Sequence, residues 1–547
     1  LESESEKPPF SLSVTMSLFE KVLVKKPKRS RLDLSHGNSV SLRWGMLTPT
    51  EVRFIVPGDE VSVSMEQIVR LAPLPVPTFV NMKVRHDWFF VPLTLMYDKG
   101  AMDLLLGTQS SRNRARVATL ADYVSLFTSV NSPLVPSSIH DYLTYPVVDD
   151  RNLDPSEVVN LSAFITSPTQ TNYDNIFATS TNAYLVAANT GPLTIEPLLA
   201  YHYIWRDYYR FTGVQVDTTP GVESWLENHV FAGSFANSAL TSSSTFTSLV
   251  NAHFRHRGAN AGTETWMTYL GVPYYAHYKK DMFTSVRYGT KPVVLIPTGA
   301  SGNIPNLREA SAIQRFIDVI SVAGQRYWDK VPALYDVVPE GMKDERVKFL
   351  ARYQSFVKVG EVITTATTAQ AETGDYAGRG LLVDGKYLFR RRFTEHGWLM
   401  CISSIVPDLH YTGLSRQISD VNMLDTPIPS LAQVGDQSVF RREMFFSFAS
   451  NSDNASVMGD QFRYYAYKSA PSEVHGDFKM KSFEAWTASF TDVGNSIIDA
   501  TKVRPSVWNR VFNLNSDAPV FGSRFFLDLT FHEFINRALP KYINYSL

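Results

Sequence analysis

The chain has 547 residues, and its 52 basic and 53 acidic side chains give a formal net charge of −1. Charged residues make up 19% of the chain and aromatic residues 13%, so charge is scarce beside the roughly 25% of an average soluble protein. The hydrophobic fraction of 44% excludes a disordered chain, and the near-zero net charge argues against a protein whose whole surface binds nucleic acid. We find no membrane-spanning apolar run, no signal-peptide core and one cysteine, Cys401, so we expect folding in a reducing compartment.

Residues 1–35 are expected to form an N-terminal arm ahead of a single folded domain at 36–547. The arm has no clear periodicity, and it contains a cluster of five basic side chains, Lys25, Lys26, Lys28, Arg29 and Arg31. Such a cluster can neutralise phosphates without reading a base sequence. A solvated linker would explain the same composition, so both interpretations stay open at this point.

The dominant periodicity is that of strands. Residues 60–65 and 80–85 alternate between polar and apolar side chains, which is typical of strands with one buried face, and the second run continues into the apolar residues 88–91. A turn signal at 56–59 precedes the first of them. Further strands are expected at 397–406, 442–448, 462–468 and 524–534. Strands gathered from both ends of a long chain predict a β-sandwich with large insertions at about 94–197, 214–277 and 300–390.

Two helices are expected inside the insertions. Leu198, Tyr201, Trp205 and Tyr208 share one helical face, and Gly213 is a plausible stop. A second helix begins near Asn306 with a capping-box pattern and continues to about residue 324 with an apolar stripe. We interpret both helices as packing elements.

Two segments are almost free of charge. Residues 160–194 contain one charged side chain, Asp174, and residues 231–252 contain none. Hydroxyl and amide groups mixed with aromatic residues suit protein contacts, where charge is depleted. The pattern favours an interface or an exposed recognition surface over an ordinary surface loop.

A search for catalytic patterns finds little. His253 and His256 are three residues apart, but no acidic side chain near them completes a metal-ligand set. Glu395 and His396 adjoin an expected strand, where neighbouring side chains point to opposite faces, so we interpret them as structural. No nucleophile elbow, phosphate loop or dinucleotide loop is present, and we predict no cofactor and no metal. A pair of carboxylates facing each other in space is a possibility that sequence spacing does not test.

Several blocks, in one order along the chain, resemble the major capsid protein of the microviruses, which are small icosahedral bacteriophages. The resemblance is strongest to the gokushovirus-like branch. The most specific block is Phe393-Thr394-Glu395-His396-Gly397. The others lie at 31–37, 56–59, 70–74, 88–92, 203–210, 280–285, 307–327, 431–437, 463–468 and 537–542.

The resemblance implies an eight-stranded antiparallel jelly roll with long loop insertions, in a protein that is not an enzyme. It further implies a T=1 icosahedral shell of sixty copies around a circular single-stranded DNA genome. Minor virion proteins with scaffolding, DNA-piloting or spike roles would be partners, and assembly would take place in the bacterial host cytoplasm. With this resemblance in view, the basic cluster of the arm is expected to face the DNA.

The segment at 214–277 is longer than in many relatives, so we expect it to project outward and to bind a host cell-surface receptor. Its candidate recognition residues are Phe231, Phe235, Phe246, His253 and His256. Two other interpretations stay open. One is a β-rich glycoside hydrolase, which needs two carboxylates across a cleft, and the other is a host-binding spike or adhesin module.

Overall fold

A computed structural model describes the chain in several separate stretches. They are residues 29–96, 139–145, 196–209, 273–286, 327–337, 346–363, 376–419, 426–432, 435–448, 454–489, 508–512 and 523–539, with positions 137, 194, 308, 311–313, 315–316, 319, 503 and 541. Among these residues, no helix is long and apolar enough to cross a bilayer.

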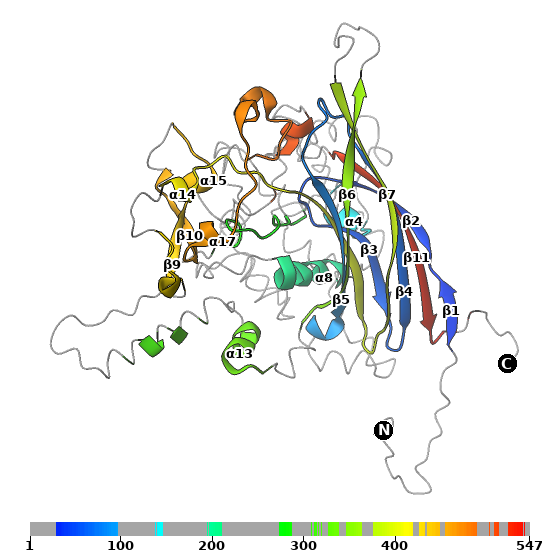
Figure 1. Ribbon diagram of the computed structural model, residues 1–547. Coiled ribbons are helices and arrows are strands. Elements are labelled where there is room, and N and C mark those ends of the chain that lie inside the picture. Colours follow the sequence, from blue (N-terminus) through cyan, green and yellow to red (C-terminus); the bar gives the residue numbers. More distant parts are fainter. Residues whose placement is uncertain are drawn as a thin grey trace, which may run out of the picture.

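Nine of the described strands form one antiparallel sheet, which curls along its length (Figure 1). Its strands are β1 (Ser30–Asp33), β2 (His36–Leu42), β3 (Thr48–Ile55), β4 (Glu60–Leu71), β5 (Met82–Pro92), β6 (Lys348–Ile363), β7 (Tyr376–Arg392), β8 (Gly397–Pro407) and β11 (Phe525–Arg537). A separate small sheet pairs β9 (Asp436–Phe440) with β10 (Val457–Phe462).

The large sheet consists of two halves. One half has the order β2-β11-β4-β7, with β1 extending β2 along the edge of β11, and the other has the order β6-β5-β8-β3. They are joined where Lys358–Ile363 of β6 pairs with Tyr376–Leu381 of β7. Two antiparallel halves of five and four strands, with β1 and β2 sharing one edge, are consistent with a jelly roll, and the expected mainly-β fold class is confirmed.

The predicted strands at 60–65, 80–91, 397–406 and 524–534 are all present, as β4, β5, β8 and β11. The turn before β4 also forms as expected. Gly58 has φ of +88°, which favours glycine, and the Asp59 carboxylate accepts a hydrogen bond from the Val56 backbone N–H at 2.9 Å. The turn therefore closes on its own side chain before the strand begins.

The strands predicted at 442–448 and 462–468 are wrong. The chain there forms one-turn helices, α15 (Arg441–Met444) and α17 (Tyr465–Lys468). The Glu443 carboxylate accepts a hydrogen bond from the Phe440 backbone N–H at 3.0 Å, which caps the first helix. Tyr464 has φ of +62°, which turns the chain out of β10 before α17. Apolar alternation alone did not predict these local reversals.

The insertions fall into two connections. Residues 93–347 all lie between β5 and β6, so the expected insertions at 94–197 and 214–277 belong to one connection between these two strands. The range 300–390, which we expected to be an insertion, contains β6 and most of β7. A second long connection between β8 and β11 carries the small sheet.

The helical elements outside the sheets are η1 (Leu93–Leu95), α4 (Ile139–Tyr142), α8 (Glu196–Ile204), η2 (Trp205–Tyr209), α13 (Tyr327–Tyr335), α14 (Arg416–Ser419), η6 (Pro429–Leu431), η7 (Gly476–Lys479), η8 (Lys481–Phe483) and η9 (Asn509–Phe512).

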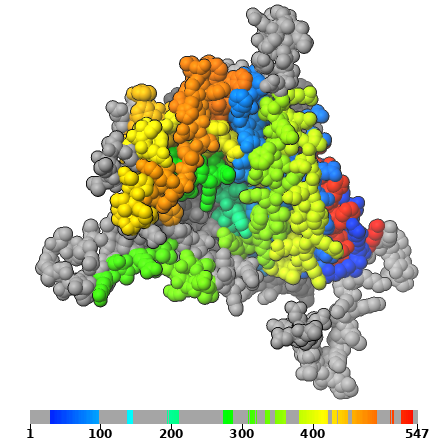
Figure 2. Space-filling model, viewed as in Figure 1, coloured from blue at the N-terminus to red at the C-terminus, as the bar shows by residue number. Residues whose placement is uncertain are grey.

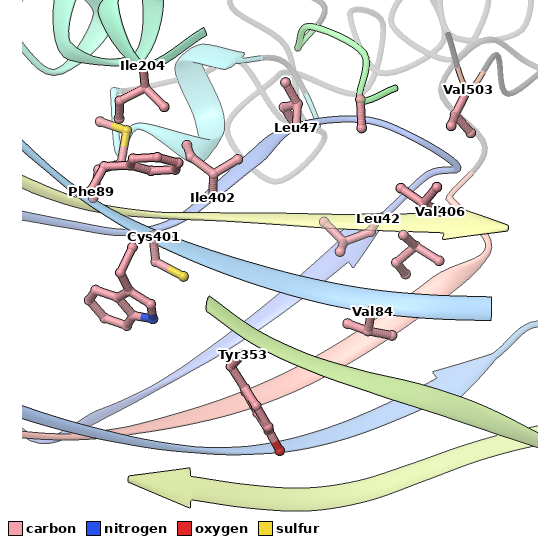
Figure 3. Packing of buried hydrophobic residues seen from close by; sticks show 14 of the residues in the cluster. Leu42, Leu47, Val84, Phe89, Ile204, Tyr353, Cys401, Ile402, Val406 and Val503 are labelled. Carbon is pink, nitrogen blue, oxygen red and sulfur yellow. The ribbon is translucent and has the colours of Figure 1, made fainter. Parts of the chain in front are cut away.

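The helix predicted around Leu198 is present as α8, and it continues into the π-helical turn η2. It packs against β5 and β8, and Figure 3 shows Ile204 beside Phe89 and Ile402. The described positions between 308 and 319 are helical, as predicted. Ile313 and Phe316 of that apolar stripe are 42% and 49% exposed, however, so the stripe is not packed into the core as we expected.

Candidate functional site

The structure places two residues of the basic cluster. Arg29 is exposed and donates a hydrogen bond to the Gly58 carbonyl oxygen. Arg31 lies in β1, and its guanidinium carbon is 4.4 Å from the centre of the Phe534 ring. Both residues are exposed at the protein surface. Lys25, Lys26 and Lys28 lie outside the described residues, so the role of the arm stays a prediction.

The expected host-recognition residues also lie outside the described residues. They are Phe231, Phe235, Phe246, His253 and His256. The same holds for nearly all of the two uncharged segments at 160–194 and 231–252. Their assignment as recognition surfaces stays a prediction.

A pair of carboxylates meets inside the sandwich, where β2 and β11 approach β3. Arg53 contacts both carboxylates, because its Nη2 atom is 2.8 Å from Glu51 and its Nε atom is 2.8 Å from Glu533. His36 adds a fourth ionisable group, with its Nε2 atom 2.7 Å from the Glu51 carboxylate. We call His36, Glu51, Arg53 and Glu533 the seam cluster, because it connects the two halves of the sheet.

The seam cluster resembles an acid/base pair only in composition. Burial raises the pKa of Glu533 to about 7, and the hydrogen bond to Glu51 raises the pKa of His36. However, Glu51 is 5% exposed and Glu533 is 0% exposed, so a saccharide chain does not reach either carboxylate. The donor atoms of His36, Glu51 and Glu533 lie within 4.8 Å of one another, but Arg53 already supplies the positive charge between the carboxylates. The geometry is that of a core ion-pair cluster.

A second polar group crosses the core as a chain of hydrogen bonds. The buried His86 ring contacts the Ser403 hydroxyl through Nδ1 at 2.7 Å and the Gln67 side-chain oxygen through Nε2 at 2.9 Å. An amide oxygen only accepts, so Nε2 carries the proton and Ser403 donates to Nδ1. Gln67 donates onward to Ser355 at 3.2 Å, and Ser355 donates to Asp384 at 2.8 Å. The chain joins β8, β5, β4, β6 and β7.

Other charged contacts attach the insertions to the sheet. Asp87 of β5 is 1% exposed and accepts hydrogen bonds from Arg352 Nε at 2.6 Å and from the Tyr209 hydroxyl at 2.6 Å. The Glu395 carboxylate accepts from Lys348 Nζ at 2.8 Å. These contacts hold η2 and the start of β6 in place, and for Glu395 they support the structural interpretation.

A small cavity lies away from the sandwich, in the connection that carries α14 and α17. Its volume is about 130 Å³, well below the roughly 300 Å³ at which small-molecule sites begin. Its charged lining is already paired, because Arg416 Nη1 lies 3.2 Å from the Glu443 carboxylate. The cavity does not have the form of an active site.

Sequence reasoning missed the seam cluster and the hydrogen-bond chain. One signal was present. Along β11 the inward positions Phe525, Leu527, Leu529 and Phe531 are apolar, and Glu533 continues that series as a charged residue. A charge at a core-facing position predicts a buried partner. The identity of that partner comes from strand order, since Arg53 is hundreds of residues away in the chain.

The fold is a mainly-β sandwich with two long connections, the architecture of double-sheet jelly rolls such as viral capsid and lectin domains. The comparison with known families agrees with it. The family described as "Capsid protein (F protein)" matches residues 21–148 and 259–544, and the chain belongs to this family. It is therefore a capsid protein of microvirus type, as the sequence resemblance predicted, and a component of a virion shell.

Two relatives cover nearly the whole chain. The "Capsid protein VP1" of Chlamydia phage 1 is 24% identical over 535 residues, which is 87% of this chain and 89% of that protein. The "Capsid protein VP1" of Bdellovibrio phage phiMH2K is 20% identical over 532 residues, which is 90% of this chain and 89% of that protein. The family match skips residues 149–258, which include both uncharged segments in full.

Proposed function

We propose that this chain is the major subunit of a T=1 icosahedral shell, in which sixty copies enclose a circular single-stranded DNA genome. Membership of the capsid family over most of the chain carries this proposal. The sandwich fold and the use of buried charge for packing support it. Assembly takes place in the cytoplasm of a bacterial host with minor virion proteins as partners, and the chain has no catalytic role.

The proposal is tested by expressing the full chain with the other virion proteins of its genome and imaging the purified particles by cryo-electron microscopy. We expect particles of one size with sixty equivalent copies of this chain. Particles with a different copy number would contradict the T=1 arrangement. A chain that stays monomeric with all partner proteins present would contradict the shell function itself.

The basic cluster of the arm is proposed to contact the genome. Replacement of Lys25, Lys26, Lys28, Arg29 and Arg31 by serine removes five positive charges that phosphates would otherwise attract. We expect these particles to lose DNA at a lower salt concentration than unchanged particles. Equal DNA retention at every salt concentration would leave the arm as a linker.

The segment at 214–277 is proposed to recognise the host. Its first 45 residues fall in the stretch 149–258 that the family match skips, and family-variable loops on a common scaffold are the usual carriers of partner specificity. The test replaces Phe231, Phe235 and Phe246 by serine and measures phage adsorption to host cells. We expect intact particles with reduced adsorption. Normal adsorption by intact variant particles, or a particle map with this segment on the inner face, would contradict the proposal.

A further inference from the structure

The outer face of β11, β4, β7 and the adjoining part of β6 carries exposed aromatic and basic side chains on the same rungs. Phe526 of β11 pairs with Arg70 of β4, Arg70 pairs with Leu381 of β7, and Leu381 pairs with Lys358 of β6. Residues paired across antiparallel strands point to the same face, so these four side chains form one row. Phe526 is 50% exposed and Leu381 is 43% exposed.

The face continues with the same chemistry. On the neighbouring rung, Ile68 pairs with Val383, and both side chains are exposed. Farther along, Ser64 pairs with Tyr387, which is 57% exposed. Phe356 lies two residues before Lys358 and so shares its face. Figure 2 shows the yellow-green surface of β6 and β7 facing the viewer with no other described element across it.

Three acidic groups on this face have polar partners, and one of these partners is an arginine. Glu60 accepts hydrogen bonds from Arg390 at 2.8 Å and Asn536 at 3.1 Å, and Glu66 lies 3.4 Å from His532. The Asp528 carboxylate accepts a hydrogen bond from Ser39 at 3.1 Å.

Three basic side chains on this face have no ion-pair partner among the described residues. Within the described part of the chain, no carboxylate forms an ion pair with Arg70, Lys358 or Arg379, which is on the same face because it pairs with Gly360. The first row therefore holds basic side chains that have no carboxylate partner among the described residues, next to exposed apolar side chains.

We propose that this face, defined by Phe526, Tyr387, Phe356, Arg70, Lys358 and Arg379, is a binding surface for single-stranded DNA. This inference rests on the proposed genome-enclosing function and deepens it. Bases stack on exposed rings without sequence preference, and the intervening cations attract the phosphates. Arg31, a member of the basic cluster, lies at the edge of this surface, where its guanidinium stands over the ring of Phe534.

The alternative occupant is a second copy of this chain. The cores of protein interfaces are poor in charge. Here Arg70 stands between Phe526 and Leu381, and Lys358 follows Leu381 at the end of the row. Burying them against another protein without partner carboxylates would be unfavourable, whereas phosphates neutralise them directly. The charge pattern favours nucleic acid.

The test measures binding of the full chain to a fluorescein-labelled oligodeoxythymidine by fluorescence anisotropy at several salt concentrations. Replacing Phe526 and Tyr387 by leucine keeps apolar volume but removes the rings, and we expect binding about tenfold weaker. Replacing Arg70, Lys358 and Arg379 by serine should lower the slope of log affinity against log salt by about 2. The conservative change Phe526→Trp should preserve binding, because the larger ring also stacks.

Matched controls lie away from this face. Phe448 is 96% exposed and Lys481 is also exposed, so Phe448→Leu and Lys481→Ser should leave affinity and salt slope unchanged. Unchanged affinity in both face variants would overturn the proposal. If the face variants keep their DNA affinity but no longer form particles, the proposal is also overturned, and the face is assigned to contacts between copies of the chain. Because anisotropy requires no assembled shell, failure of the shell proposal would be visible separately, in the particle experiment.

Discussion

The two halves of the sheet differ in how many of their faces are buried. In the half β6-β5-β8-β3, nearly every residue of β5 and β8 is buried, because one face lines the sandwich core and α8 covers the other. In the half β1-β11-β4-β7, burial alternates strictly along β4 and β11. The first half is completed by this chain's own insertions. The second half exposes a face that is suited to a partner outside the chain.

The largest effect should come from the interior that both halves share. Trp88 of β5 is 0% exposed and packs edge-on against Phe389 and Phe531 of the opposite half, with ring centres 5.6 and 5.8 Å away. We expect Trp88→Ala to lower the free energy of unfolding by about 3–5 kcal/mol in urea denaturation. The matched change Val383→Ala, at a side chain that is 67% exposed, should alter it by less than about 0.5 kcal/mol. Equal losses would mean that the outer face is also part of the core.

The seam cluster should make the contact between the halves sensitive to pH. The pKa of Glu533 is about 7 in the folded chain, above its ordinary value of 4.5, so the folded state binds this proton more tightly. Stability from this group is therefore present at low pH and is lost as pH rises from about 4.5 to 7. The raised pKa of His36 acts in the same direction.

We expect Glu533→Gln to flatten this decline by about 2 kcal/mol, measured as unfolding free energy against pH. Glu66→Gln, at an exposed position on the outer face of β4, serves as the control and should reproduce the unchanged profile. A Glu533→Gln variant with an unaltered pH profile would show that the cluster does not titrate in this range.

A smaller loss should follow from interrupting the hydrogen-bond chain through His86. Ser403→Ala removes the donor to Nδ1 of a ring that is fully buried, and the unpaired nitrogen should cost about 1–3 kcal/mol. Burial lowers the pKa of His86 to about 4, so its contribution to stability is lost as pH falls from 6.5 toward 4. Ser64→Ala, on the outer face of β4, is the matched control. Similar losses in the two variants would show that the chain contributes no specific stability.

The smallest effect concerns reactivity rather than stability. Cys401 of β8 is 0% exposed, and burial raises the pKa of its thiol, so few thiolates form in the folded chain. We expect no reaction with a thiol reagent such as DTNB until the chain is unfolded in urea. A cysteine introduced by Ser39→Cys, at an exposed position of β2, should react in the folded state. Fast reaction of Cys401 in the folded chain would indicate that the half β6-β5-β8-β3 opens readily.

The same contrast explains how far the sequence could predict the structure. In strands with one solvent-exposed face, such as β4 and β11, polar and apolar residues alternate along the sequence. The positions of these two strands were therefore predicted correctly. The strands at 442–448 and 462–468 were predicted wrongly, because Glu443 and Tyr464 make local turns that override apolar patterning. The candidate DNA cations were found only in part, since the arm is a compact cluster in sequence whereas Arg70, Lys358 and Arg379 are spread over three strands.

The sequence by itself determined the class of protein: charge-poor, aromatic, rich in strands, with one cysteine and the ordered blocks of a capsid family. These properties are local or compositional, so they can be read without knowing which strands are neighbours. Only the tertiary structure decided that Glu533 meets Arg53, that His86 joins five strands and that one sheet face stays open. Each of these three features depends on the order of strands in the sheet, because antiparallel pairing brings together residues hundreds of positions apart in the chain.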